Sequence, residues 1–142
     1  MKEDRIKIKA CVGVMIFKDG KVLLGKRKGS HASGEYTFTG GHLEYKESLR
    51  KAAERETLEE AGIKIKNLKF LCISNIDRYE NRQDIVIGFT ADWESGEARI
   101  MEPEKSDGWG WYGLDDLPQP LFYPAELIID SYKTGKIFYD KE

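Results

Sequence analysis

The stretch GGHLEYKESLRKAAERETLEEAGI, residues 40–63, decides the fold expected for this chain. Between Ser48 and Ala61 it contains neither glycine nor proline, and alanine, leucine, glutamate, lysine and arginine dominate. This composition favours a helix of about four turns. Ser48 can cap the first turn, and Gly62 can end the last one. We therefore predict a helix over residues 48–61.

The predicted helix carries three glutamates whose direction bears on function. Its apolar stripe consists of Leu49, Ala52, Ala53 and Ile63. At about 100° of rotation per residue, the stripe continues into three carboxylates, those of Glu56, Glu59 and Glu60. We therefore expect all three to face the protein interior. The plain alternative is a surface helix with a charged end, because charge runs usually lie on solvated faces.

Inward carboxylates need compensation, because they repel one another and lose hydration. Arg55 is the adjacent cation, and it can pair with one carboxylate and fix its orientation. Several oxygen ligands of like charge suit a hard cation such as Mg²⁺ or Mn²⁺. Magnesium readily completes its shell with substrate phosphates. The pattern therefore indicates cleavage of a phosphate ester or anhydride by a metal-activated water.

Composition limits the remaining classes of function. The 142 residues are 40% hydrophobic and 34% charged, which is typical of one folded domain, and we assign residues 1–142 to it. A net charge of −2 offers no basic field for a nucleic-acid polymer. No apolar run reaches the ~20 residues of a membrane helix. Residues 1–17 predict a strand and not a signal peptide, which places the protein in the cytoplasm. Cys11 and Cys72 lie in apolar runs and are expected to be buried, reduced thiols.

Strand-like segments surround the predicted helix. Residues 6–17 and 21–27 flank an Asp19-Gly20 pair, a strong hairpin signal. Further strands are predicted at 36–41, 65–76, 84–93 and 109–114, and a second helix at 125–135. This order favours an α+β fold with a mixed sheet. The C-terminal tail is expected to pack on the domain, with a lid or a dimer contact as alternatives.

The central stretch resembles the Nudix box, G-x5-E-x7-R-E-U-x-E-E-x-G-U, where U is a bulky aliphatic residue. The match spans Gly41 to Ile63, and Thr57 is its one departure. VLLGKRKGS before the box and EPEKSDGWGWYGLDDLP after it resemble the MutT-related nucleoside-triphosphate diphosphatases of that family. The likeness covers roughly residues 8–120. It implies an α/β/α sandwich, with the box forming a loop–helix–loop.

The resemblance also implies roles for residues of the box. Glu56 and Glu60 match the metal ligands, and Glu59 matches an acid that binds metal or takes the proton of the attacking water. Arg55 matches the residue that orients a glutamate. The carbonyl of Gly40 is a further expected ligand. In addition, Gly41 lets the backbone approach the metal, and Glu47 serves the helix start or supports the ligands.

Four residues outside this core are weighed against plainer interpretations. Arg27 matches a phosphate or substrate contact of the family, and the alternative is that it lies at a solvated hairpin end. Glu104 is the preferred distant acid, as against an ordinary loop charge. Trp109 shares a strand face with Trp111 and could stack on a base, although core packing is the commoner use. His42 could touch phosphate or be a simple loop histidine, whereas we expect no function for His31.

The resulting hypothesis is a Mg²⁺-dependent hydrolase, with Mn²⁺ as the second choice of ion. It would convert a free nucleoside triphosphate, such as a modified or deoxy purine nucleotide, to the monophosphate and pyrophosphate. One alternative keeps the metal site and takes a nucleotide sugar or a dinucleotide polyphosphate. Another is a nucleotide-sensing module without catalysis. The resemblance also favours a homodimer.

Overall fold

The computed structural model describes residues 6–29 and 31–141. They form two helices and one mixed sheet of eight strands. The elements in chain order are β1 (Ile8–Lys18), β2 (Lys21–Arg27), β3 (Tyr36–Thr37), β4 (Thr39–His42), α1 (Leu49–Ala61), β5 (Lys64–Ile76), β6 (Gln83–Ser95), β7 (Ser106–Gly113), α2 (Tyr123–Thr134) and β8 (Phe138–Tyr139). The predicted α+β class with a mixed sheet is confirmed.

The sheet is built around β1. Its order is β3-β2-β1-β6-β5-β8, with β4 also paired to β1 and β7 to β2. The predicted hairpin joins β1 to β2, and both turn residues, Asp19 and Gly20, have positive φ. β1 runs parallel to β6 over ten residue pairs, whereas it pairs with β2 only near the hairpin. The edge of β1 that faces away from β6 pairs with β4 at residues 11–14 and with β2 at residues 17 and 18. β4 and β2 therefore occupy different parts of the same edge.

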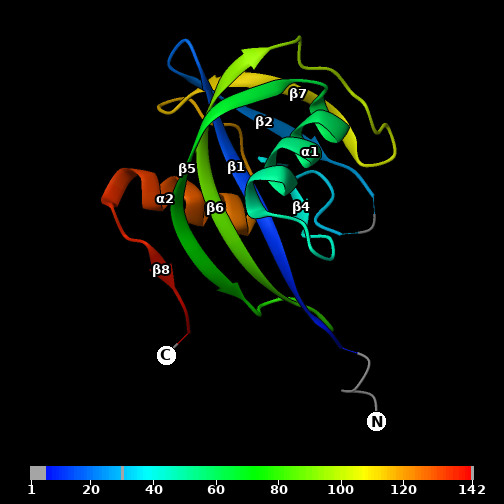
Figure 1. The fold of residues 1–142 in the computed structure, drawn as a ribbon, viewed down its shortest axis with the longest axis vertical. Helices are drawn as coiled ribbons and strands as arrows, with labels where there is room; N and C mark the ends of the chain where they lie inside the picture. Colours follow the sequence, from blue (N-terminus) through cyan, green and yellow to red (C-terminus); the bar gives the residue numbers. More distant parts are fainter. Residues whose placement is uncertain (1–5, 30, 142) are drawn as a thin grey trace.

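Two hydrophobic cores occupy the opposite faces of the sheet, as alternation along β1 requires. Val12, Val14 and Ile16 pack in a cluster with the alanines of α1. Met15, from the other face, packs with residues of α2 such as Ile128. Figure 1 shows the two helices on different sides of the long strands β1 and β6. This is the α/β/α arrangement that the resemblance implies.

The ends of α1 follow the predicted capping. The Ser48 side chain accepts a hydrogen bond from the amide of Lys51 at 3.1 Å, and Gly62 closes the helix with φ of 72°. Thr57, the departure from the box pattern, is fully buried. Its hydroxyl lies 2.9 Å from that of Thr39 on β4, so a hydrogen bond replaces the aliphatic contact usual at this position.

The C-terminal part packs against the sheet. After α2, β8 adds to the edge of β5 in parallel, a short strand that the sequence did not predict. The buried Tyr139 donates a hydrogen bond to Asp130 of α2. Both cysteines are buried and unpaired. Within the described residues, neither helix has the length and apolar character needed to cross a membrane. The predicted strand over residues 1–17 begins in the structure at Ile8, and residues 1–5 lie outside the described part.

Candidate active site

The direction of α1 corrects one expectation about its three glutamates. The side chain of Glu59 is 51% exposed, and Leu49 is also exposed, so neither faces the interior. The buried positions are Ala52, Ala53, Thr57 and Ala61. Their centre lies about 65° from Glu56 around the helix axis, which places Glu60 inside the buried arc, Glu56 at its edge and Glu59 outside it. The apolar stripe is therefore rotated away from Glu59.

Glu60 is a half-buried acid whose residue is hydrogen-bonded to both β4 and β7. Its Oε1 accepts a hydrogen bond from the Gly40 amide of β4 at 2.8 Å. Its backbone carbonyl accepts another from the indole of Trp109 at 3.1 Å. No cationic side chain bonds this carboxylate among residues 6–29 and 31–141. Burial raises the pKa of Glu60 to about 8, and the negative charges of Glu56 and Glu102 act in the same direction.

Glu56 lies beside the glycine pair that precedes the helix. Its side chain is only 15% exposed, and burial raises its pKa although Arg55 opposes the shift. A Cβ atom added to Gly41 would lie 2.4 Å from Oε2 of Glu56. At Gly40 an added Cβ would lie 2.1 Å from the Val12 carbonyl oxygen of β1. Both positions therefore require glycine, one for the carboxylate and one for the sheet.

Arg55 organises the acids that surround Glu60. It donates two hydrogen bonds to Glu47, of 2.7 and 3.0 Å. A third, of 2.7 Å, reaches Oε1 of Glu56, and a weaker one of 3.2 Å reaches Glu59. The guanidinium holds the pKa of Glu47 below its usual range. Arg55 thus bonds both Glu47 and Glu56, and its role of orienting Glu56 stays a prediction.

The loop before β7 brings a different acid to the site from the one preferred in the sequence analysis. Glu102 raises the pKa of both Glu56 and Glu60 by its charge, whereas Glu104 is not among the causes of either shift. Glu102 is half-buried and Glu104 is exposed, although both line the same cavity. The reason is the turn over residues 102–105, where the Lys105 amide bonds the Glu102 carbonyl. Glu102 is therefore the better placed of the two.

A polar cavity of about 360 Å³ opens next to Glu60. Its charged lining consists of Lys26, Arg27, Lys28, Glu60, Glu102, Glu104 and Lys105. Arg27 is half-buried against the Phe122 ring, with 4.3 Å between guanidinium carbon and ring centre, while Lys28 remains exposed. The predicted inward direction of Arg27 is thus observed. Both cations and acids line this cavity, which suits a phosphate chain together with a metal ion.

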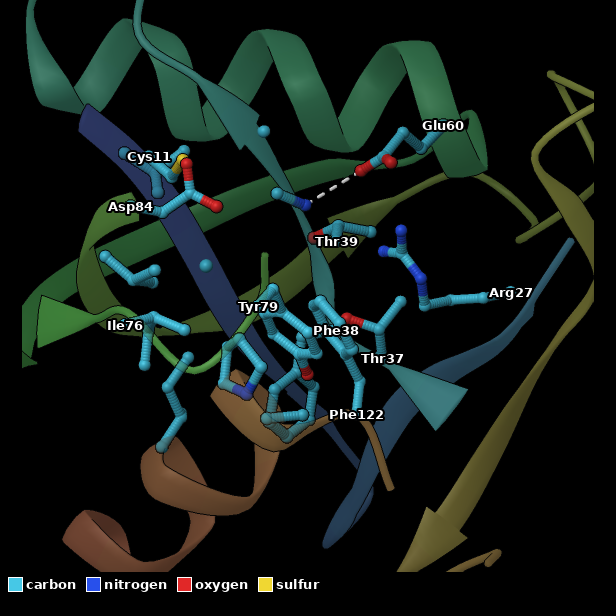
Figure 2. A pocket seen from close by; sticks show the side chains of 18 of the residues that line it. Cys11, Arg27, Thr37, Phe38, Thr39, Glu60, Ile76, Tyr79, Asp84 and Phe122 are labelled. Atoms are coloured by element: carbon cyan, nitrogen blue, oxygen red, sulfur yellow. Dashed lines mark hydrogen bonds between the residues drawn. The ribbon is translucent and has the colours of Figure 1, made fainter. Parts of the chain in front are cut away.

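An aromatic cavity of about 120 Å³ lies on the other side of Glu60. Three of its walls are rings, those of Phe38, Tyr79 and Phe122, and Tyr79 stacks on Phe122 with 6.1 Å between ring centres. Figure 2 shows Glu60 with its bond to Gly40 at one end, the rings in the middle and Asp84 with Cys11 at the other end. The two cavities share Arg27, Thr37 and Glu60.

Sequence reasoning missed most of the aromatic cavity. Tyr79 lies in a polar connection and Phe122 in a proline-broken one, so neither segment carried a signal for a binding site. The proximity of these two segments depends on α2 packing behind the sheet. His31, for which no function was expected, lies edge-on to both rings. Its ring centre is 4.7 Å from that of Tyr79 and 5.8 Å from that of Phe122. An aromatic residue in each connection was the one available clue.

Two predicted substrate contacts have other surroundings in the structure. The side chain of His42 lines neither cavity; its Nε2 lies 3.9 Å from Oδ1 of Asp84, and its backbone carbonyl accepts a hydrogen bond from Arg55. It sits at the end of β4, where it is the register partner of Cys11 and shares its face of the sheet. Trp109 lines the polar cavity but also packs over Gly25 and the α1 core together with Trp111. Its packing explains its position without a ligand.

The site fits a divalent metal ion. Glu60 is an enclosed carboxylate without a cationic partner in the described part of the chain, and Oε2 of Glu56 faces the cradle that a Cβ at Gly41 would fill. Carboxylate and carbonyl oxygens are the ligands that Mg²⁺ and Mn²⁺ prefer. Glu59 accepts a hydrogen bond from Arg55 and is exposed, so it lies at the outer edge of this set of carboxylates.

A family model and curated proteins that are similar to this chain agree on its family. A family model described as NUDIX domain matches residues 7–131. The NAD-capped RNA hydrolase NudC of Escherichia coli (strain SMS-3-5 / SECEC) is 34% identical over 136 residues, which are 94% of this chain and 51% of that protein. The chain thus spans about half the length of the curated relatives it matches.

Solved structures give the same picture. The MutT NUDIX hydrolase from Burkholderia pseudomallei aligns with a TM-score of 0.83 and 32% identity, covering 88% of this chain and 98% of that one. The NUDIX domain of Shewanella oneidensis NrtR, complexed with ADP ribose, aligns with a TM-score of 0.77 over 92% of this chain and 90% of that one. At 21% identity the second likeness shows the fold alone. The predicted resemblance and hydrolase class are confirmed at the level of the family.

Proposed function

The chain belongs to the NUDIX domain family, and from this premise we propose that it hydrolyses a nucleoside triphosphate to the monophosphate and pyrophosphate with a divalent metal ion. The observation that carries the proposal is the position of Glu60 where the aromatic and polar cavities meet. A nucleotide has the same two-part character, since a flat base lies at one end and a charged phosphate chain at the other.

The aromatic cavity supports the binding of a nucleobase. Tyr79 and Phe122 present ring faces, and stacking on an aromatic ring is favourable for any base. Asp84 at the far end is buried and can accept hydrogen bonds from ring or exocyclic N–H groups. A modified or deoxy purine nucleotide is the substrate that we propose for this cavity.

The polar cavity supports the phosphate chain. Arg27 lies between the two cavities, where its guanidinium can reach a phosphate next to the sugar. Lys28 and Lys105 add positive charge at the outer wall. We propose phosphate binding for Arg27, while substrate contacts by His42 and Trp109 stay predictions.

Glu56 and Glu60 would hold the metal ion, with Glu59 and the Gly40 carbonyl as further candidate ligands. When bound, Mg²⁺ or Mn²⁺ would neutralise phosphate charge and lower the pKa of a water molecule. Arg55 favours the ionised form of Glu56 and would orient it through their 2.7 Å hydrogen bond. Glu102 is the acid that we propose as proton acceptor in place of Glu104, because its charge acts on both ligands.

A second candidate substrate is a dinucleotide in which a nucleoside diphosphate is joined to another group. The curated relatives named NAD-capped RNA hydrolase are 33–34% identical to this chain, which favours a substrate with an adenosine diphosphate part. The same acids would act on it, because only the group beyond the second phosphorus changes.

We also keep the homodimer as a proposal that light scattering can test.

The test is a panel of nucleotides incubated with Mg²⁺, with products identified by chromatography. Nucleoside monophosphate with pyrophosphate supports the first proposal, and two monophosphates from NAD support the second. Glu60→Gln should lower the rate of either reaction on the order of 10²–10³-fold, while Glu54→Gln, an exposed position of the same helix, should not. Binding of nucleotides without any product would overturn both and favour a sensor.

A further inference from the structure

Three strands bring a thiol, an imidazole and a carboxylate together at the end of the aromatic cavity away from Glu60. Cys11 of β1 is the register partner of His42 of β4. On its other side Cys11 pairs with Val86 of β6, two residues after Asp84. Side chains two apart on a strand share a face. Cys11, His42 and Asp84 therefore project from the same face of the sheet, and the backbone pairing holds them there.

The ligand atoms of these three residues are close and differently exposed. One atom from each lies within 4.8 Å of the others. Cys11 and Asp84 are buried, with 8% and 9% of their surface exposed. The His42 side chain is 45% exposed and lines a surface cavity of about 400 Å³. An ion could therefore enter from the solvent side and reach buried ligands.

Neighbouring cations leave one oxygen of Asp84 available. Arg82 binds Oδ2 through two hydrogen bonds of 2.9 and 3.2 Å. The other oxygen, Oδ1, is the one that faces His42. The two hydrogen bonds from Arg82 fix the carboxylate in this orientation. The positive charges of Arg82 and of Lys9, the register partner of Asp84, would repel a bound cation.

We propose that Cys11, His42 and Asp84 form a binding site for a borderline-soft divalent ion such as Zn²⁺, separate from the carboxylate site on α1. Sulfur, nitrogen and oxygen from three protein residues are a ligand set that Zn²⁺ accepts, with a fourth position left for water. Mg²⁺ does not favour thiolate or imidazole ligands. The ligand chemistry thus separates this site from the all-oxygen site of Glu56 and Glu60.

An ion bound at this site would alter the aromatic cavity. Cys11 and Asp84 also line the aromatic cavity, so an ion bound between them would change its far wall. It would occupy the hydrogen-bonding oxygen of Asp84 and add positive charge there. Zn²⁺ at this site is therefore expected to weaken the binding of any ligand that reaches Asp84.

Cobalt titration tests the site directly, because Co²⁺ bound to a thiolate gives a charge-transfer absorption band. The full chain, kept reduced with a phosphine, should develop this band until a single ion is bound, and Zn²⁺ should abolish it while a large excess of Mg²⁺ does not. The band should disappear in Cys11→Ser and persist in Cys72→Ser, which removes the other buried thiol. It should also persist in Glu60→Gln.

His42→Gln provides a variant at an exposed position that should fold normally. Its affinity for Zn²⁺, measured by calorimetry, should fall by more than about tenfold. Absence of the band in the wild-type chain, or an undiminished band in Cys11→Ser, would overturn the proposal. An unchanged Zn²⁺ affinity in His42→Gln would overturn the three-residue site.

Discussion

Two carboxylates at opposite ends of the aromatic cavity differ in how their charge is balanced. Asp84 accepts two hydrogen bonds from Arg82. Glu60 accepts one from the Gly40 amide, and no cation bonds it in the described part of the chain. Its pKa is raised to about 8 by burial and by neighbouring acids. The comparison indicates that Arg82 balances the charge of Asp84 within the protein, whereas the charge of Glu60 is stabilised only by the Gly40 amide among the hydrogen bonds of the described residues.

Glu60→Gln should give the largest effect, because it removes the carboxylate that a metal ion would neutralise. We expect kcat to fall on the order of 10²–10³-fold, since a bound metal contributes several kcal/mol to transition-state stabilisation. Steady-state kinetics with Mg²⁺ on the best nucleotide measures this. Glu54→Gln controls for charge on α1. Equal activity of the two variants would contradict the assignment of Glu60.

Arg55→Lys should give the next largest effect, since lysine cannot bridge Glu47 and Glu56 as the guanidinium does. Loss of a residue that orients a metal ligand typically lowers metal affinity or activity about 10–100-fold. Activity measured against Mg²⁺ concentration should show a higher requirement for metal. Arg50→Lys, at an exposed position of α1, is the matched control, and a similar outcome for both would argue against positioning by Arg55.

The pH dependence of stability should reveal the contribution of Glu60 in the absence of metal. The pKa of Glu60 is raised from 4.5 to about 8, so the native state binds a proton that the unfolded state has already released between these values. In EDTA, stability should therefore fall as the pH rises from about 4.5 to about 8. Urea denaturation of the wild type and of Glu60→Gln at several pH values measures the difference. A parallel dependence in both proteins would contradict it.

Arg82→Gln should destabilise the protein by about 1–2 kcal/mol, because a buried carboxylate loses its charged partner while Arg82 itself is partly exposed. Asp84→Asn in addition should recover part of this loss. Chemical denaturation of both variants shows whether Asp84 is balanced by Arg82. If Arg82→Gln is neutral, the contrast with Glu60 fails.

Thr57→Val should have the smallest effect, about 1 kcal/mol, because it leaves the hydroxyl of Thr39 without its partner. The shape of the side chain is kept, so activity should change little. Thermal unfolding measures the loss, and the double variant Thr39→Val with Thr57→Val should restore stability. A single variant as stable as the wild type would show that this hydrogen bond contributes nothing.

The helix and its caps were predictable because local interactions determine them. Ser48, Gly62 and the apolar positions between them act within a few residues of the chain. The direction of the glutamates was only partly predictable. An angular argument placed Glu59 with Glu56 and Glu60, but the packing of α1 on β1 and β4 centres the buried arc on Ala53 and Thr57.

Contacts between distant segments could not be predicted from patterns. The choice of Glu102 over Glu104 depends on a turn that starts at Glu102. The ring walls of the aromatic cavity come from two connections without periodicity, and His42 meets Asp84 only because β1 lies between their strands. None of these pairings leaves a spacing signal in the sequence.

The sequence by itself determined the helix with its acids, the hairpin, the α+β class and the family, because these depend on residue spacing and on local backbone preferences. The tertiary structure decided which acids are enclosed, which receive a cation and which segments form the cavity. Enclosure and charge balance depend on desolvation and on neighbours far along the chain. Those quantities exist only once the helices have packed on both faces of the sheet.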